Sequence, residues 1–131
     1  MGMFGALDAA STGVSLGKTW LDASSDNVAN LNTVRPAGEQ PFRARLVVAR
    51  ARTGTEGVDV ERIAEKGGPP EVVYDPENPL ADKAGYVTRP QVDLTEEMTN
   101  IMMASRLYQA NLSVMQQARD SYKAALAIGN K

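Results

Sequence analysis

The sequence repeats apolar residues at every seventh position near both of its ends, and this pattern constrains the fold more than any other. A seven-residue spacing places side chains on one face of an α-helix, which another apolar surface must then cover. The N-terminal repeat consists of Leu7, Val14, Leu21 and Val28. The C-terminal repeat consists of Leu94, Ile101, Tyr108, Met115 and Tyr122, joined four positions later by Met98, Ser105, Leu112 and Leu126. Both ends are therefore predicted to be helical.

The N-terminal helix is predicted to be weak on its own. It contains Gly5, Gly13 and Gly17, and each glycine costs about 1 kcal/mol relative to alanine within a helix. The positions three residues after the apolar repeat are small, as at Ala10 and Ser24. We expect this helix to be frayed when isolated and to fold when a partner covers it.

The C-terminal helix is predicted to be longer and stronger. Asp93, followed three residues later by Glu96, is a start that resembles a capping box, in which a carboxylate accepts hydrogen bonds from first-turn amides. A helix of about 35 residues would be roughly 50 Å long. A small β-insertion cannot cover that length, so the N-terminal helix is its expected partner. The predicted fold class is mainly α with a small β insertion, in which long N- and C-terminal helices pair as an antiparallel coiled coil.

The middle of the chain has the pattern of short strands and turns. Between residues 42 and 61, apolar and charged residues alternate on both sides of the glycine turn at 54–57, which predicts a β-hairpin. Shorter strands are expected at 72–74 and 86–87, separated by turns rich in glycine, proline and asparagine. The predicted organisation is one helical assembly unit, residues 1–34 plus 91–131, interrupted by a β-rich insertion at 35–90.

The sequence offers no candidate catalytic, metal-binding or cofactor-binding residues. It has no cysteine and no histidine, which removes thiolate ligands, a thiol nucleophile and the commonest proton shuttle at neutral pH. Asp93, Glu96 and Glu97 fall in the first turn of the predicted helix, where acids favour the helix dipole. Residues 67–70 lack the lysine and hydroxyl of a phosphate-binding loop and are predicted to form a turn. We predict that the chain is not an enzyme and binds no cofactor.

Charge and hydropathy argue against nucleic acid and a membrane span. The formal net charge is −2, whereas phosphate binding needs a basic face. No run approaches the ~20 apolar residues of a spanning helix. The N-terminus has no positively charged start of a cleavable export signal, so export would use another route. The basic cluster, Arg43, Arg45, Arg50 and Arg52, is expected to face the acidic half of the hairpin, namely Glu56, Asp59, Glu61 and Glu65.

Asparagines and a glutamine stand at two informative places. Asn27 and Asn30 lie where the first helix is predicted to end, and Gln109 and Asn111 lie inside the second. They either terminate a helix or occupy exposed positions, or they form hydrogen bonds within or between subunits. The pattern alone favours neither interpretation.

Several segments resemble a known family. Residues 27–33, NVANLNT, resemble the N-terminal signature of the bacterial flagellar axial proteins, which comprise rod, hook and hook-associated proteins. Residues 96–118 resemble the C-terminal signature, and ASRLYQAN at 104–111 is its most specific part. PFRARLVV at 41–48 and ENPLADKAGYV at 77–87 are similar to proximal-rod members of this family.

The resemblance implies a structural subunit, exported by the flagellar type III apparatus and polymerised into the proximal rod of the basal body in the cell envelope. The implied partners are further copies of the chain, other proximal-rod and distal-rod proteins, the rod-to-membrane-ring adaptor and the export apparatus. The apolar repeats, apart from Ser105 and Leu126, would be packing positions in the assembly. The polar assembly residues would be Asn27, Asn30, Thr33, Ser105, Arg106, Gln109 and Asn111.

A second hypothesis is a cytoplasmic secretion chaperone or adaptor whose helical hairpin captures a client helix. This class predicts cooperative melting of both terminal helices in the isolated protein and its absence from purified basal bodies. A rod subunit predicts flexible ends before assembly.

Overall fold

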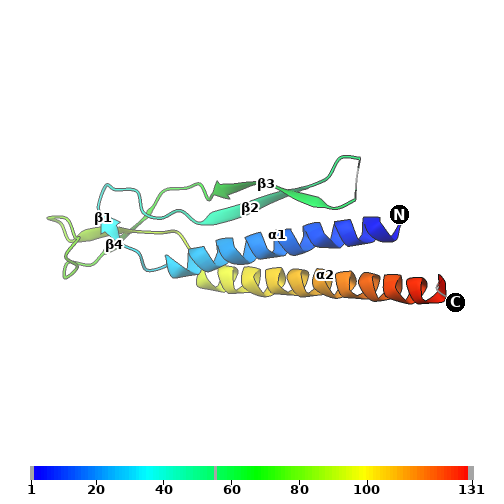
Figure 1. Cartoon of the computed structure of the whole chain (residues 1–131). Coiled ribbons are helices and arrows are strands. Elements are labelled where there is room, and N and C mark those ends of the chain that lie inside the picture. The colour runs from blue at the N-terminus through cyan, green and yellow to red at the C-terminus, as the bar shows by residue number, and fades with distance from the viewer. Residues whose placement is uncertain (1, 55, 130–131) are drawn as a thin grey trace.

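The computed structural model describes residues 2–54 and 56–129 and consists of two long helices and two small antiparallel sheets (Figure 1). Helix α1 spans Met3–Ala29 and helix α2 spans Leu94–Gly129. The strands are β1 (Arg35–Pro36), β2 (Arg45–Ala51), β3 (Val58–Glu65), β4 (Glu71–Tyr74) and β5 (Tyr86–Arg89). The prediction of two long terminal helices around a small β region is confirmed.

The two helices lie side by side and run antiparallel (Figure 1). Near the start of α1, the Phe4 ring meets the Tyr122 ring edge to face, with 6.0 Å between centroids. Near its end, the Asn27 side chain meets Glu97, close to the start of α2. Residues early in α1 thus contact residues late in α2, and residues late in α1 contact residues early in α2. The two helices are therefore antiparallel.

Side-chain hydrogen bonds mark the boundaries that the sequence predicts. Asp93 Oδ1 accepts a hydrogen bond of 2.9 Å from the backbone amide of Glu96, so the predicted cap of α2 is present. At the other boundary, Asn30 Nδ2 donates to the Asp26 carbonyl at 2.9 Å, and Thr33 Oγ1 donates to Asn30 Oδ1 at 3.3 Å. These bonds connect the last turn of α1 to the turn that follows it.

The molecule is layered, with α1 in the middle (Figure 1). The β2–β3 hairpin packs along one side of α1 and α2 packs along another, while α2 has no contact with a strand among the described residues. A register shift between Val48 and Ala49 interrupts the hairpin pairing. The second sheet, in the order β1-β5-β4, lies beyond the end of the helix pair, and Val87 in its central strand is fully buried.

Small residues form the contact between the helices. A Cβ atom added to Gly17 would lie 3.0 Å from the Tyr108 backbone nitrogen, and one added to Gly13 would lie 2.5 Å from Asn111 Cγ. Ala10 on α1 and Ala104 on α2 are buried as well. The glycines that weaken an isolated helix are therefore the residues that let the two helices approach closely.

Candidate assembly interface

Asn27 joins three elements of the fold. Its side chain is fully buried, and its Nδ2 donates to the Arg45 carbonyl at 2.9 Å and to Glu97 Oε1 at 3.0 Å. Its Oδ1 accepts a hydrogen bond of 2.7 Å from the Arg45 backbone amide. A single amide side chain thereby connects α1, β2 and α2, which gives Asn27 a hydrogen-bonding role within the subunit.

The sequence did not indicate that Glu97 is buried. It was assigned to the helix dipole as a first-turn acid, but only 4% of it is exposed, and its Oε2 has no hydrogen-bond partner. Glu97, Ala104 and Asn111 follow one another at seven-residue steps and line the side of α2 that faces α1. This repeat of polar and small residues could have indicated the side of α2 that faces α1, but the apolar repeat beside it was the more prominent pattern.

The other predicted polar residues lie in different surroundings. Asn111 Nδ2 donates to the Leu107 carbonyl of its own helix at 2.8 Å, and Asn30 and Thr33 close the end of α1. Arg106 and Gln109 are exposed and Ser105 is half-buried. None of these last three makes a side-chain hydrogen bond within residues 2–54 and 56–129, so their side chains are available to a neighbouring molecule.

Thr12 and Arg52 hold the hairpin against α1, and sequence reasoning missed this role of both. Thr12 Oγ1 accepts a hydrogen bond of 3.0 Å from the Val58 amide. Arg52 contacts Asp59 at 2.8 Å and Asp8 of α1 at 3.3 Å. The hydrogen bond with Asp59 raises the pKa of the Arg52 guanidinium above its ordinary value.

The two apolar repeats lie next to each other on one flank of the helix pair. Leu7 from α1 and Leu112 and Met115 from α2 line the same open groove of about 460 Å³. Phe4 and Tyr122 stand at one end of it. The remaining predicted packing positions divide into a half-buried and an exposed group. Val14, Leu21, Val28, Ile101 and Tyr108 are half-buried, whereas Leu94 and Met98 are exposed.

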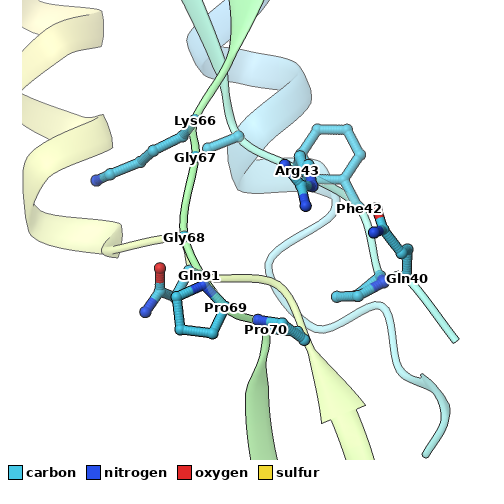
Figure 2. A pocket seen from close by; sticks show the side chains of 11 residues that line it. Gln40, Phe42, Arg43, Lys66, Gly67, Gly68, Pro69, Pro70 and Gln91 are labelled. Atoms are coloured by element: carbon cyan, nitrogen blue, oxygen red, sulfur yellow. The ribbon is translucent and has the colours of Figure 1, made fainter. Parts of the chain in front are cut away.

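The tightest crevice lies where the hairpin meets the three-stranded sheet (Figure 2). It holds about 30 Å³ and is lined by the glycine-proline turn at 67–70, together with Phe42 and Gln91. Gly68 has φ +125°, and a Cβ there would lie 3.1 Å from Gln91 Oε1. Lys66 also lines this crevice, and its ammonium group pairs with Glu96 of α2 at 3.2 Å. The crevice is the packed corner of a turn, with room for about one water molecule.

The described residues contain neither a cluster of metal ligands nor a membrane-spanning helix. No group of three or more Asp or Glu side chains among them is placed to hold a metal ion. No helix in the described ranges is both long and apolar enough to cross a membrane.

Comparison with known proteins identifies the family. Residues 83–128 match the family described as flagellar basal body rod FlgEFG protein C-terminal. The FlgC basal-body rod protein of Salmonella typhimurium is 37% identical over 133 residues, which cover 98% of this chain and 99% of the relative. The chain belongs to the FlgC family of flagellar basal-body rod proteins.

Other FlgC proteins match over nearly the full length. The Yersinia enterocolitica protein is 38% identical over 133 residues, with 98% of this chain and 99% of the relative covered. The protein of Borreliella burgdorferi is 32% identical over 149 residues, with 98% of each covered. The matched segment 83–128 contains nearly all of α2, so the FlgC-family comparison covers the helix that carries the open groove.

Proposed function

We propose that this chain is a structural subunit of the flagellar basal-body rod. Its relatives are named as basal-body rod proteins, and their similarity extends over nearly the whole chain. We place it in the proximal rod, as an exported protein that leaves the cell interior through the flagellar type III apparatus and polymerises in the envelope. The chaperone alternative finds no support among these relatives.

The observation that carries this proposal is how little of α2 its own chain covers. Of the 36 residues of α2, only Glu97 and Ala104 are buried. Met98, Met102 and Met103 are exposed, as are Val114 and Leu126 on later turns. Fully covering one such side chain contributes roughly 1.5–3 kcal/mol, so neighbouring subunits that cover several of them would stabilise an assembly considerably.

The helix pair fits the role of an assembly unit. We propose that α1 and α2 form an antiparallel coiled coil within residues 1–34 and 91–131, and that the insertion at 35–90 stands outside it. Small residues hold the pair together, while the apolar repeats remain available along one flank. In this arrangement a neighbouring helix, and not α2 alone, covers Leu7, Val14 and Leu21.

The proposed partners follow from a position inside the rod. They are further copies of this chain, the other proximal-rod and distal-rod proteins, the rod-to-membrane-ring adaptor and the export apparatus. We propose no catalytic activity, because the relatives are named as flagellar basal-body rod proteins.

Replacing Leu112 by aspartate tests the proposal. Leu112 is 37% exposed and lines the groove, so the change places a charge on the flank without opening the contact between the helices. In a motile strain whose only copy carries Leu112→Asp, we expect loss of swimming and loss of the chain from purified basal bodies. The matched control is Ser113→Asp, at the exposed neighbouring position, which should swim normally. Normal motility of Leu112→Asp would contradict the assembly role of this flank.

A further inference from the structure

An exposed aromatic patch lies at the end of the molecule formed by the three-stranded sheet (Figure 1). We call Val72, Tyr74 and Tyr86 the tyrosine patch. Tyr74 and Tyr86 are direct partners across β4 and β5, and their rings meet edge to face with 5.3 Å between centroids. Val72 is two residues before Tyr74 on the same strand and so points to the same face. These side chains are 61%, 64% and 41% exposed, in the order Val72, Tyr74 and Tyr86.

The turn before β5 holds this patch in place. Gly85 has φ +85°, and a Cβ there would lie 2.8 Å from Tyr74 Cε2, so the ring packs directly on the glycine. Asp82 Oδ1 accepts hydrogen bonds of 2.9 Å from the backbone amides of Ala84 and Tyr86. Two large rings are thus fixed while they remain exposed. Fixed aromatic side chains lose little conformational entropy on binding, which suits them to a protein interface.

The charge around the patch indicates what binds to it. Residues 75–85, between the two tyrosines, contain three acids and one base, Lys83. None of these acids forms an ion pair with the described part of the chain. An acidic rim around tyrosine rings fits a guanidinium group, which pairs with carboxylates and stacks on aromatic faces. The three acids are Asp75, Glu77 and Asp82. Glu71 lies on the opposite face of β4 and pairs across the strands with Arg89.

The same chain carries the complementary chemistry elsewhere. Residues 43–52 contain four arginines and no acid. Arg45 pairs with Asp26 and Arg52 with Asp8 and Asp59, whereas Arg43 and Arg50 form no ion pair within the described ranges. Arg43 lines the crevice beside the three-stranded sheet, whereas Arg50 is exposed near the end of β2.

The patch and Arg50 are far apart within one molecule. Arg50 lies towards the hairpin turn, which extends alongside α1 to the end that carries the N-terminus, whereas β4 lies beyond the opposite end of the helices (Figure 1). Complementary surfaces at the two ends of one subunit meet only between subunits, and such a head-to-tail contact can repeat without closing. We propose that the tyrosine patch binds Arg50 of a neighbouring copy of this chain. This inference rests on the proposed function, because rod assembly brings copies together.

Cysteine cross-linking tests the contact, since the chain has no cysteine of its own. Two differently tagged copies, one with Val72→Cys and one with Ala51→Cys, are expressed in the same motile strain. A thiol-specific cross-linker is then applied to purified basal bodies. We expect a mixed dimer only when both cysteines are present. Replacing Val72→Cys by Ser113→Cys, on the exposed surface of α2, is the control and should give none.

The outcomes separate this inference from the proposed function. If both tagged copies are present in basal bodies but no mixed dimer forms, the contact is refuted and the rod role stands. If neither copy is found in basal bodies, the rod role itself fails, and the inference fails with it.

Charge reversal then tests whether a second copy of this chain supplies the arginine that binds the tyrosine patch. In the cross-linking pair, we expect Arg50→Glu on one copy, or Glu77→Arg on the other, to lower the dimer yield about tenfold, equivalent to ~1.4 kcal/mol. Combining both reversals should restore most of the yield, and Asp120→Arg on α2 should leave it unchanged. If the combination stays as low as Glu77→Arg alone, another protein supplies the cation, and the proposed pairing of copies is wrong.

Discussion

Replacing Asn27 by aspartate tests how much one buried amide contributes to the three-way junction. The change keeps the size of the side chain but converts its donor into an oxygen, which removes the bonds to the Arg45 carbonyl and to Glu97. The bond from the Arg45 amide to Oδ1 can remain. A neutral hydrogen bond contributes about 1 kcal/mol and one to a charged group about 1.5–3 kcal/mol. The new carboxylate would also face Glu97 Oε1 from the position, 3.0 Å away, that Nδ2 now occupies.

We therefore expect Asn27→Asp to lower the free energy of unfolding by roughly 3–5 kcal/mol, a large part of the total of about 5–15 kcal/mol typical of a domain. The assay is the loss of this chain from purified basal bodies, where the helix pair is assembled, as urea is raised, measured by the amount of chain retained at each urea concentration. Asn32→Asp, at an exposed position beyond the helix, is the control and should change stability by less than ~0.5 kcal/mol.

A second substitution distinguishes the hydrogen bond from a general loss of packing. When Glu97→Gln is combined with Asn27→Asp, the amide introduced at position 97 can donate to the carboxylate introduced at position 27, so the bond forms again in the opposite direction. We expect the double variant to recover about 1.5–3 kcal/mol relative to Asn27→Asp alone. The amount of each variant in purified basal bodies should follow the same order. A double variant no more stable than Asn27→Asp would refute the role assigned to this bond.

Two further predictions concern the contacts of α1. Gly17→Leu should separate the helices, because its Cβ alone would lie 3.0 Å from backbone on α2. We expect a loss of about 3 kcal/mol in the same urea assay on basal bodies, with Ser15→Leu, on the exposed side of α1, nearly neutral. Thr12→Val should leave the amide of Val58 without its partner and cost about 1–2 kcal/mol, visible as faster hydrogen exchange of that amide. Thr19→Val, where the hydroxyl bonds only within α1, should leave that exchange rate unchanged.

The sequence predicted both helices because their apolar residues recur with helical spacing, but it did not predict which side of each helix faces the other. The prediction assumed that the largest apolar residues meet across the pair. In the structure, Gly13 and Gly17 face Tyr108 and Asn111, and Leu7 lies beside this contact. This assumption fails for a subunit whose apolar residues are covered by neighbouring subunits. The closest contact between its own helices needs small residues.

In the hairpin, the local sequence pattern predicts the strands, whereas the contacts of the complete fold determine the ion pairs. Alternation predicted its two strands, yet only Asp59 among the expected acids pairs with a basic residue on β2 or directly after it, and that residue is Arg52. Arg45 pairs instead with Asp26 of α1, which hairpin spacing cannot indicate. Strand β1 also escaped prediction, because its two residues are defined only by their pairing with β5.

The middle position of α1 has a consequence for how such a subunit can diversify. The strands of the insertion pack on α1, through contacts such as those of Asn27 and Thr12, whereas the insertion reaches α2 through the ion pair of Lys66 with Glu96. Residues could therefore be added to or removed from the insertion without reshaping the outer flank of α2. The helix pair could then stay the same while the outer segments that it carries differ in size. Changes in those segments would be inherited independently of the contacts made by α2.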